Sequence, residues 1–201
     1  EDKYTFALNE FANYLGLKEI NKIEGYDISH NFGENAVGSC VVYSKMGPSR
    51  ENYRLFNIPK NLSGNDVGSL KNVIERRLKY YDDLEIKPDV VLIDGGSSQL
   101  KFVNEVINNS NHTDIVVISI VKGTKRVRAT ETIIGNKGII ELDKYSKAYL
   151  LLQEIRDESH RFAIQAQRKK KKRRISKSKL DSIPGVGDHL KKRLFKKFKN
   201  K

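Results

Sequence analysis

The sequence is poor in cysteine and lacks any long apolar run. Cys40 is the single cysteine of the 201 residues, which excludes an intramolecular disulfide and a zinc site built on cysteines. The longest apolar stretches, such as residues 115–121, have the length of a strand and are too short to span a membrane. The chain begins with Glu1, and its first residues lack the basic and apolar regions of a signal peptide. We therefore expect a fragment of a cytoplasmic protein with no membrane partner.

Acidic residues are scarce in the last part of the chain. From residue 165 onward there are 16 lysines and arginines and only two aspartates, whereas residues 1–164 carry 22 basic and 23 acidic residues. A near-neutral domain is thus followed by a strongly cationic segment. Such a segment is either merely solvated or binds a polyanion. Clustered Lys and Arg favour a nucleic acid, because binding to its phosphates releases counterions.

The hydrophobic pattern predicts an α/β domain. The expected strands, in chain order, are 23–30, 36–44, 51–58, 90–94 and 114–120, followed by a β-hairpin over 127–142. Helical spacing of apolar residues predicts helices over 6–15, 66–81 and 97–107 and one long helix from about residue 146. The first three strands have short connections and should form an antiparallel meander. This order predicts a mixed sheet flanked by helices, as in the ribonuclease H superfamily.

Two of the predicted strands carry an aspartate at a position suited to chemistry. Asp94 ends the apolar run Val90–Ile93 just before two glycines, at the carboxyl edge where open α/β sheets bind ligands. Asp27 lies within the first strand, where an isolated acid is costly unless it is paired or bound to a cation. Taken alone, Asp27 could be a salt-bridged edge residue. If the two strands are neighbours, both carboxylates can instead converge on a divalent cation, Mg²⁺ or Mn²⁺.

Other candidates lie on the predicted helices. His160 could be an ordinary surface residue, or its imidazole could reach the same metal ion as a ligand or act as a general base. Asp66 precedes a helix, where we expect it to be the N-cap. His30 and Lys122 are weaker candidates, since each can be an ordinary strand residue.

The basic segment ends in a glycine-rich turn between two short helical patterns. Gly185 and Gly187 would let backbone N–H groups approach a phosphate, with Lys191 and Lys192 just beyond them. The spacing resembles a helix-hairpin-helix motif, which grips a nucleic-acid backbone without reading bases. A simple helical hairpin is the alternative. The expected DNA-binding residues also include a basic run, namely Arg168, Lys169, Lys170, Lys171 and Lys172.

Several segments together resemble the C-terminal half of the UvrC family, the excinuclease subunits that cut damaged DNA in bacterial nucleotide excision repair. The segments include "IEGYDISHNF", "PDVVLIDGGSSQL", "LLQEIRDESHRFAI" and "LDSIPGVG". The resemblance implies a ribonuclease H-like endonuclease domain over 1–166, a basic linker over 167–179 and an incomplete helix-hairpin-helix element over 180–201. It also implies incision on the 5′ side of a lesion.

The same resemblance implies roles for individual residues. The metal-binding set of the family falls on Asp27, Asp94 and His160, and a further functional acid falls on Asp66. In that segment Asn65 stands where the family has a second aspartate. After "IDGG" the chain has residues 97–99, Ser-Ser-Gln, where the family has Gly-Lys-Gly-Gln, so a basic contact near the site is missing.

The implied partners are lesion-bearing double-stranded DNA and UvrB, with UvrA acting earlier in the pathway. The family's segment that docks on UvrB belongs to its N-terminal half, which this sequence does not contain. Two other classes of function remain open from the residues. One is a non-catalytic DNA-binding module with a silent nuclease site. The other is a ribonuclease H-like nuclease that acts on another nucleic-acid structure, such as a DNA junction or an RNA–DNA hybrid.

Overall fold

The structure, a computed structural model, forms two compact units, Glu1–Ile164 and Gln165–Lys201. It describes residues 2–29, 36–83, 87–122 and 131–181, with side chains up to residue 170 in the last range, and eight further residues, namely 184, 185, 187, 189, 190, 193, 194 and 197. His30 and the first residues of the expected hairpin, 127–130, lie outside this set.

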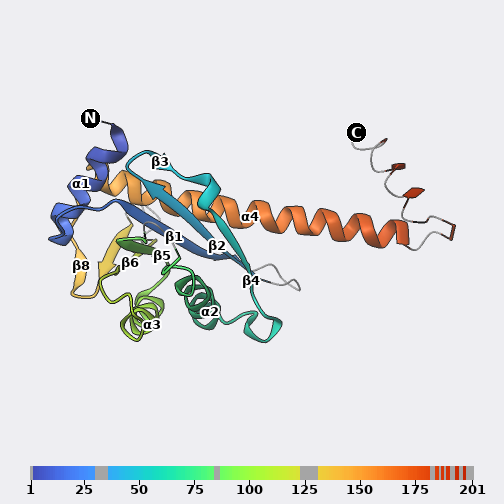
Figure 1. Cartoon of the computed structure of the whole chain (residues 1–201), viewed down its shortest axis with the longest axis horizontal. Helices are drawn as coiled ribbons and strands as arrows, with labels where there is room; N and C mark the ends of the chain where they lie inside the picture. Colours follow the sequence, from blue (N-terminus) through green and yellow to red (C-terminus); the bar gives the residue numbers. More distant parts are fainter. Residues whose placement is uncertain are drawn as a thin grey trace. The chain divides into compact units, whose positions relative to one another are not determined.

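One eight-stranded mixed sheet forms the centre of the first unit (Figure 1). The strands lie in the order β3-β2-β1-β5-β6-β7-β8, and β4 pairs with β2 outside this path. Their bounds are β1 Lys22–Ser29, β2 Val37–Ser44, β3 Gly47–Pro48, β4 Arg54–Asn57, β5 Val90–Asp94, β6 Val116–Val121, β7 Thr132–Gly135 and β8 Gly138–Ile140. The strand β1 is antiparallel to β2 but parallel to β5, and β5 is parallel to β6. The predicted ribonuclease H-like mixed sheet is confirmed.

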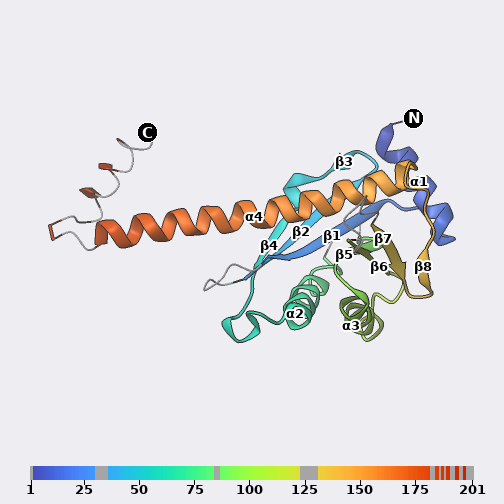
Figure 2. The same cartoon turned by 180° about the vertical axis from the view of Figure 1, so that it is seen from behind.

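Helices cover both faces of this sheet (Figures 1 and 2). They are α1 Lys3–Leu15, α2 Asp66–Leu78, α3 Ser97–Asn108 and α4 Lys147–Asp181, with short 3-10 helices at Arg50–Asn52 and Lys60–Leu62. Gly38 of β2 lies against Val73 of α2, whereas Gly25 of β1 lies against Ile155 of α4. Because Gly38 pairs with Ile28, three residues after Gly25, the two glycines point to opposite faces. The helix α2 therefore packs on one face and the first turns of α4 on the other.

The strand β5 is buried on both faces because helices cover both. Val90, Val91, Leu92 and Ile93 are all at most 1% exposed. Parallel strands that are buried on both faces have nearly continuous apolar sequences. The prediction of a buried strand that ends at Asp94 is confirmed.

Three local predictions differ from the structure. The N-cap of α2 is Asn65, whose side chain accepts a hydrogen bond from the Gly68 N–H, so the prediction for Asp66 was wrong by one residue. The strand expected over 51–58 is shortened at its start, because residues 50–52 form a 3-10 helix. Residues 167–179, expected as a linker, are helical, consistent with the high helix propensity of Lys, Arg and Gln.

Among the described helices, none combines the length and the apolar character that crossing a bilayer requires.

Candidate active site

Two carboxylates lie side by side at the carboxyl edge of β1 and β5. The parallel register pairs Tyr26 with Ile93, so the next residues along the two strands, Asp27 and Asp94, are neighbours. Asp27 is only 7% exposed, and Asp94 is partly buried. The sequence suggested this convergence only if the two strands were adjacent, and the sheet order makes them adjacent.

The two carboxylates interact electrostatically. Burial raises the pKa of the Asp94 carboxyl above its usual range, and the negative charge of Asp27 raises it further. The positive charges of Arg156 and Lys122 oppose this rise in pKa, as does His160 when its ring is protonated. Placing two like charges side by side in a partly buried edge is unfavourable unless cations compensate them. The pair is therefore suited to hold a cation.

The turn that follows Asp94 is fixed by three hydrogen bonds. The Ser119 hydroxyl donates to the Gly95 carbonyl, and the Gly95 N–H donates to the Ile120 carbonyl over 3.4 Å. The Gly96 N–H donates to the side chain of Gln99, with 2.5 Å between N and Oε1. Gln99 belongs to the first turn of α3, so this bond ties the turn to the helix. These bonds fix the path of the backbone immediately after Asp94.

The helix α4 brings His160 to the same face of the sheet as Asp27. The His160 Nδ1 lies 3.1 Å from Asp27 Oδ2. One residue earlier, the Ser159 carbonyl accepts a hydrogen bond from the Ser39 hydroxyl over 2.8 Å, which fixes α4 against β2. The His160 side chain is 58% exposed, so its ring remains accessible from solvent. His160 is thus an exposed residue that contacts Asp27, and its role at the site stays a prediction.

Arg156 and Glu131 form a further ion pair that the sequence did not predict, and the charge of Arg156 acts at Asp94. Arg156 precedes His160 by one helical turn, and its guanidinium forms an ion pair with Glu131 at the start of β7. The two side chains are only 13% and 6% exposed. Helical spacing from His160 could have drawn attention to Arg156. No sequence signal pointed to Glu131, because the residues around it read only as a hairpin.

The other predicted residues lie on other elements of the first unit. Asp66 is exposed in the first turn of α2, which packs on the opposite face of the sheet from Asp27. Lys122 directly follows β6, and its charge contributes at Asp94. The structure therefore groups Asp27, Asp94 and His160 on one face and leaves Asp66 outside that group.

The predicted DNA-binding residues belong to the second unit and are only partly described. Arg168, Lys169 and Lys170 are exposed on α4. Lys171 and Lys172 are helical in backbone, while Lys191 and Lys192 lie outside the described residues. Gly185 has a left-handed backbone with φ of 86° and is exposed, as is Gly187. A left-handed glycine is consistent with the predicted tight turn.

The described side chains contain no group of three or more His, Cys, Asp or Glu donors already placed to hold a metal ion. The donor chemistry nevertheless fits a hard divalent cation, since Asp27 and Asp94 supply adjacent carboxylate oxygens and His160 supplies an imidazole. The repulsion between the two carboxylates is the observation that supports this fit, because a bound cation would relieve it.

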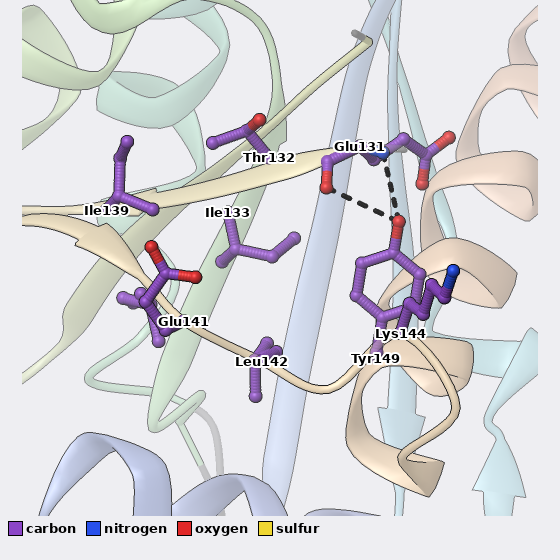
Figure 3. Close-up of a pocket in the computed structure, with 9 residues that line it drawn as sticks. Glu131, Thr132, Ile133, Ile139, Glu141, Leu142, Lys144 and Tyr149 are labelled. Atoms are coloured by element: carbon purple, nitrogen blue, oxygen red, sulfur yellow. Dashed lines mark hydrogen bonds between the residues drawn. The ribbon is translucent and has the colours of Figure 1, made fainter. Parts of the chain in front are cut away.

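A pocket of about 330 Å³ lies at the other side of Glu131, between the β7–β8 hairpin and the start of α4 (Figure 3). Ile133 and Leu142 line it, and the carboxylate of Glu131 points away from both. The Tyr149 hydroxyl bonds to the backbone of Glu131 at the wall of the pocket. The pocket is thus separate from the carboxylate pair.

Comparison with known proteins identifies a family. A family model described as the UvrC RNase H endonuclease domain matches residues 12–164. The UvrABC system protein C of Legionella pneumophila (strain Paris) is 40% identical over 184 residues, which is 90% of this chain and 30% of that protein. The protein of the same name from Saccharophagus degradans is 42% identical over 189 residues, or 92% of this chain and 31% of that protein. The chain spans about a third of the length of the curated relatives it matches.

Solved structures give a weaker likeness. The endonuclease V of Streptomyces avermitilis matches with a TM-score of 0.43 and 12% identity, over 85% of this chain and 94% of that one. Human ENDOV matches with a TM-score of 0.38 and 19% identity, over 54% of this chain and 48% of that one.

Proposed function

This chain belongs to the UvrC family and contains its RNase H endonuclease domain, and from that premise we propose that it makes the 5′ incision at damaged DNA in nucleotide excision repair. The observation that carries the proposal is the grouping of Asp27, Asp94 and His160 on one face of the sheet. Two adjacent carboxylates and an accessible imidazole are the parts that metal-dependent phosphodiester hydrolysis requires.

Asp27 and Asp94 would hold a Mg²⁺ or Mn²⁺ ion. When bound, this cation would polarise the scissile phosphate, lower the pKa of the attacking water and stabilise the leaving 3′ oxygen. The partly buried edge keeps both carboxylates fixed, because each follows directly on a strand residue paired within the sheet. Asp66, in the first turn of α2, would bind a second ion or position water.

His160 is suited to act as the general base. If its Nδ1 donates its proton to Asp27, then Nε2 presents a lone pair that can accept a proton from water. The water oxygen then forms a bond to phosphorus while the bond from phosphorus to the 3′ oxygen breaks. Asp27 would orient the ring and stabilise the imidazolium that results. The alternative role, third ligand to the metal ion, uses the same side chain and is distinguished by experiment below.

The basic residues of the second unit would hold the duplex. The exposed residues Arg168, Lys169 and Lys170 can contact phosphates without reading bases, which suits an enzyme directed by lesions rather than by sequence. The helix-hairpin-helix element around Gly185 and Gly187 would add backbone contacts. In this proposal, recognition of damage and recruitment belong to UvrA and UvrB, the partners of the full-length family members.

The experiment that tests the proposal is Mn²⁺-dependent nicking of supercoiled plasmid by the 201-residue chain, alongside Asp27→Ala and Asp94→Ala. Nicking by the parent that each substitution abolishes would support a metal nuclease at this site. Equal nicking by all three chains would show contamination and overturn the assignment. If no chain nicks, the non-catalytic binding module is the better description. Parallel assays on an RNA–DNA hybrid, a DNA junction and a lesion-bearing duplex would identify the preferred substrate.

A further inference from the structure

The Glu131–Arg156 ion pair has no part in the proposed mechanism, yet the charge of Arg156 acts at Asp94. The sheet register shows which face Glu131 occupies. Ile120 of β6 pairs with Asp94 on one side and with Ile133 of β7 on the other, so these three side chains point to one face. Glu131 lies two residues before Ile133 and therefore points to that same face. This face thus carries three carboxylates. Asp27 and Asp94 lie in one row across the sheet, and Glu131 lies two residues beyond that row.

One stripe of α4 spans these three acids. Tyr149, Arg156 and His160 are separated by seven and four residues, so they lie on the same side of the helix. At one end, the Glu131 N–H donates to the Tyr149 hydroxyl over 3.0 Å, and that hydroxyl lies 3.3 Å from the Glu131 carbonyl (Figure 3). At the other end, His160 contacts Asp27. Arg156 lies between them along the helix, and its charge acts at Asp94.

Arg156 forms no ion pair with Asp94, although the structure describes both side chains. Its positive charge nevertheless acts to lower the pKa of Asp94. Its guanidinium is bound by Glu131 on one side and by Asp157 on the other, with 2.5 Å between Nη2 and Asp157 Oδ1. A guanidinium next to a carboxylate normally forms two parallel hydrogen bonds with it. If Arg156 did this with Asp94, it would occupy the oxygens that a divalent cation needs.

We infer that Glu131 is a positioning residue that holds Arg156 away from Asp94 and so keeps both site carboxylates available to the divalent cation. Glu131 is well placed for this task, because its side chain is 94% buried and its backbone is fixed by Tyr149. A buried carboxylate binds a guanidinium more firmly than the exposed Asp157 can. The inference rests on the proposed function, since it presumes that Asp27 and Asp94 bind a metal ion.

The test is a Mn²⁺ titration of the whole chain with two readouts, the shift in melting temperature and the nicking rate. Glu131→Gln should release Arg156 toward Asp94 and raise the Mn²⁺ concentration for half-saturation about tenfold in both readouts. Adding Arg156→Gln to that variant removes the competing cation and should return half-saturation to within about twofold of the parent. Glu158→Gln is the matched control, because it frees Arg161 from a similar ion pair on the same helix. It should leave Mn²⁺ half-saturation unchanged.

The outcomes separate this inference from the proposed function. If the parent shows neither Mn²⁺ stabilisation nor nicking, or if Asp94→Ala responds like the parent, the proposed function fails and this inference fails with it. If the parent responds and Asp94→Ala does not, an unchanged half-saturation in Glu131→Gln overturns the inference alone. Failure of the double variant to recover would also overturn it. Should Glu131→Gln not fold, Arg156→Gln alone decides, since a raised half-saturation in that variant contradicts competition.

Discussion

Gly25 of β1 and Ile155 of α4 are in direct contact, and this contact sets how closely the helix that carries His160 approaches the sheet. A Cβ atom added at Gly25 would overlap the Cγ2 methyl of Ile155 and lie 3.1 Å from a methyl of Val41. Only a residue without a side chain permits this approach. The distance from His160 to Asp27 therefore depends on a glycine two positions before Asp27.

Gly25→Ala should move α4 outward. We expect a loss of about 1–3 kcal/mol in the free energy of unfolding, since overpacking of a filled core has this cost. Nicking should fall about 100-fold, because a displacement of about 1 Å at a catalytic group is enough for such a loss. Urea unfolding and plasmid nicking measure the two effects. In an Ile155→Ala background the same substitution should cost less stability, and strict additivity of the two would contradict the contact argument.

His160→Ala should abolish most nicking without unfolding the chain. Loss of a general base typically lowers the rate about 10²- to 10⁴-fold. The imidazole is more than half exposed, so the free energy of unfolding should change by less than about 1 kcal/mol. The Mn²⁺ dependence decides between the two roles of His160. A base leaves the half-saturating Mn²⁺ concentration unchanged while the maximal rate falls, whereas a metal ligand raises that concentration.

The buried ion pair of Glu24 and Arg77 should matter far more for stability than any exposed pair. Glu24 is fully buried and accepts hydrogen bonds from Arg77, Tyr26 and Tyr81, with 2.7 Å between Glu24 Oε1 and Arg77 Nη2. Glu24→Gln leaves a buried guanidinium without its counter-charge, and we expect a loss of about 3–5 kcal/mol. Glu75→Gln is the control. It removes the exposed partner of Lys71 and should cost at most about 0.5 kcal/mol. Similar losses in the two variants would contradict the argument.

The same buried cluster predicts alkaline sensitivity. Burial, assisted by the negative charge of Glu24, raises the pKa of the Tyr81 phenol well above its usual range, and burial does the same for the pKa of Tyr26. Above about pH 10 these phenols lose protons in the unfolded chain but keep them in the folded one. The unfolded state then binds fewer protons, so stability falls by about 1.4 kcal/mol per pH unit for each phenol. Urea unfolding between pH 9 and 11 should show a shallower fall in Tyr81→Phe, and equal slopes would count against this account.

The sheet and the two aspartates could be predicted because their signals are local. An unbroken apolar run that ends in "DGG" predicts both the buried strand and the exposed edge at which Asp94 lies. Asp27 was visible as an acid inside an apolar strand. Neither position revealed the strand order, however, and the pairing of the two acids depends on β1 lying beside β5. That adjacency comes from tertiary packing.

The Glu131–Arg156 pair shows what sequence reasoning could not reach. The two residues are 25 positions apart in the sequence. Locally, Glu131 looks like an ordinary hairpin residue and Arg156 like part of a charged helix surface. They meet only because α4 crosses the sheet at Gly25. Likewise, the sequence could not show that α2, which begins with Asp66, packs on the opposite face of the sheet from Asp27.

The cationic segment should determine how the affinity for DNA depends on salt. All 16 basic residues beyond Gln165 lie within residues 168–201, so deleting that range removes them while leaving the first unit whole. Each phosphate contact contributes about −0.9 to the slope of log K against log salt concentration on duplex DNA. The truncated chain should therefore show a slope smaller in magnitude by several units in a fluorescence titration with a labelled duplex. A second variant, with glutamine at Lys169, Lys170, Lys171 and Lys172, keeps the length of the chain. The magnitude of its slope should fall by up to the contribution of about four phosphate contacts. If both variants keep the slope of the parent, the duplex is held by the first unit, and the basic segment is only solvated.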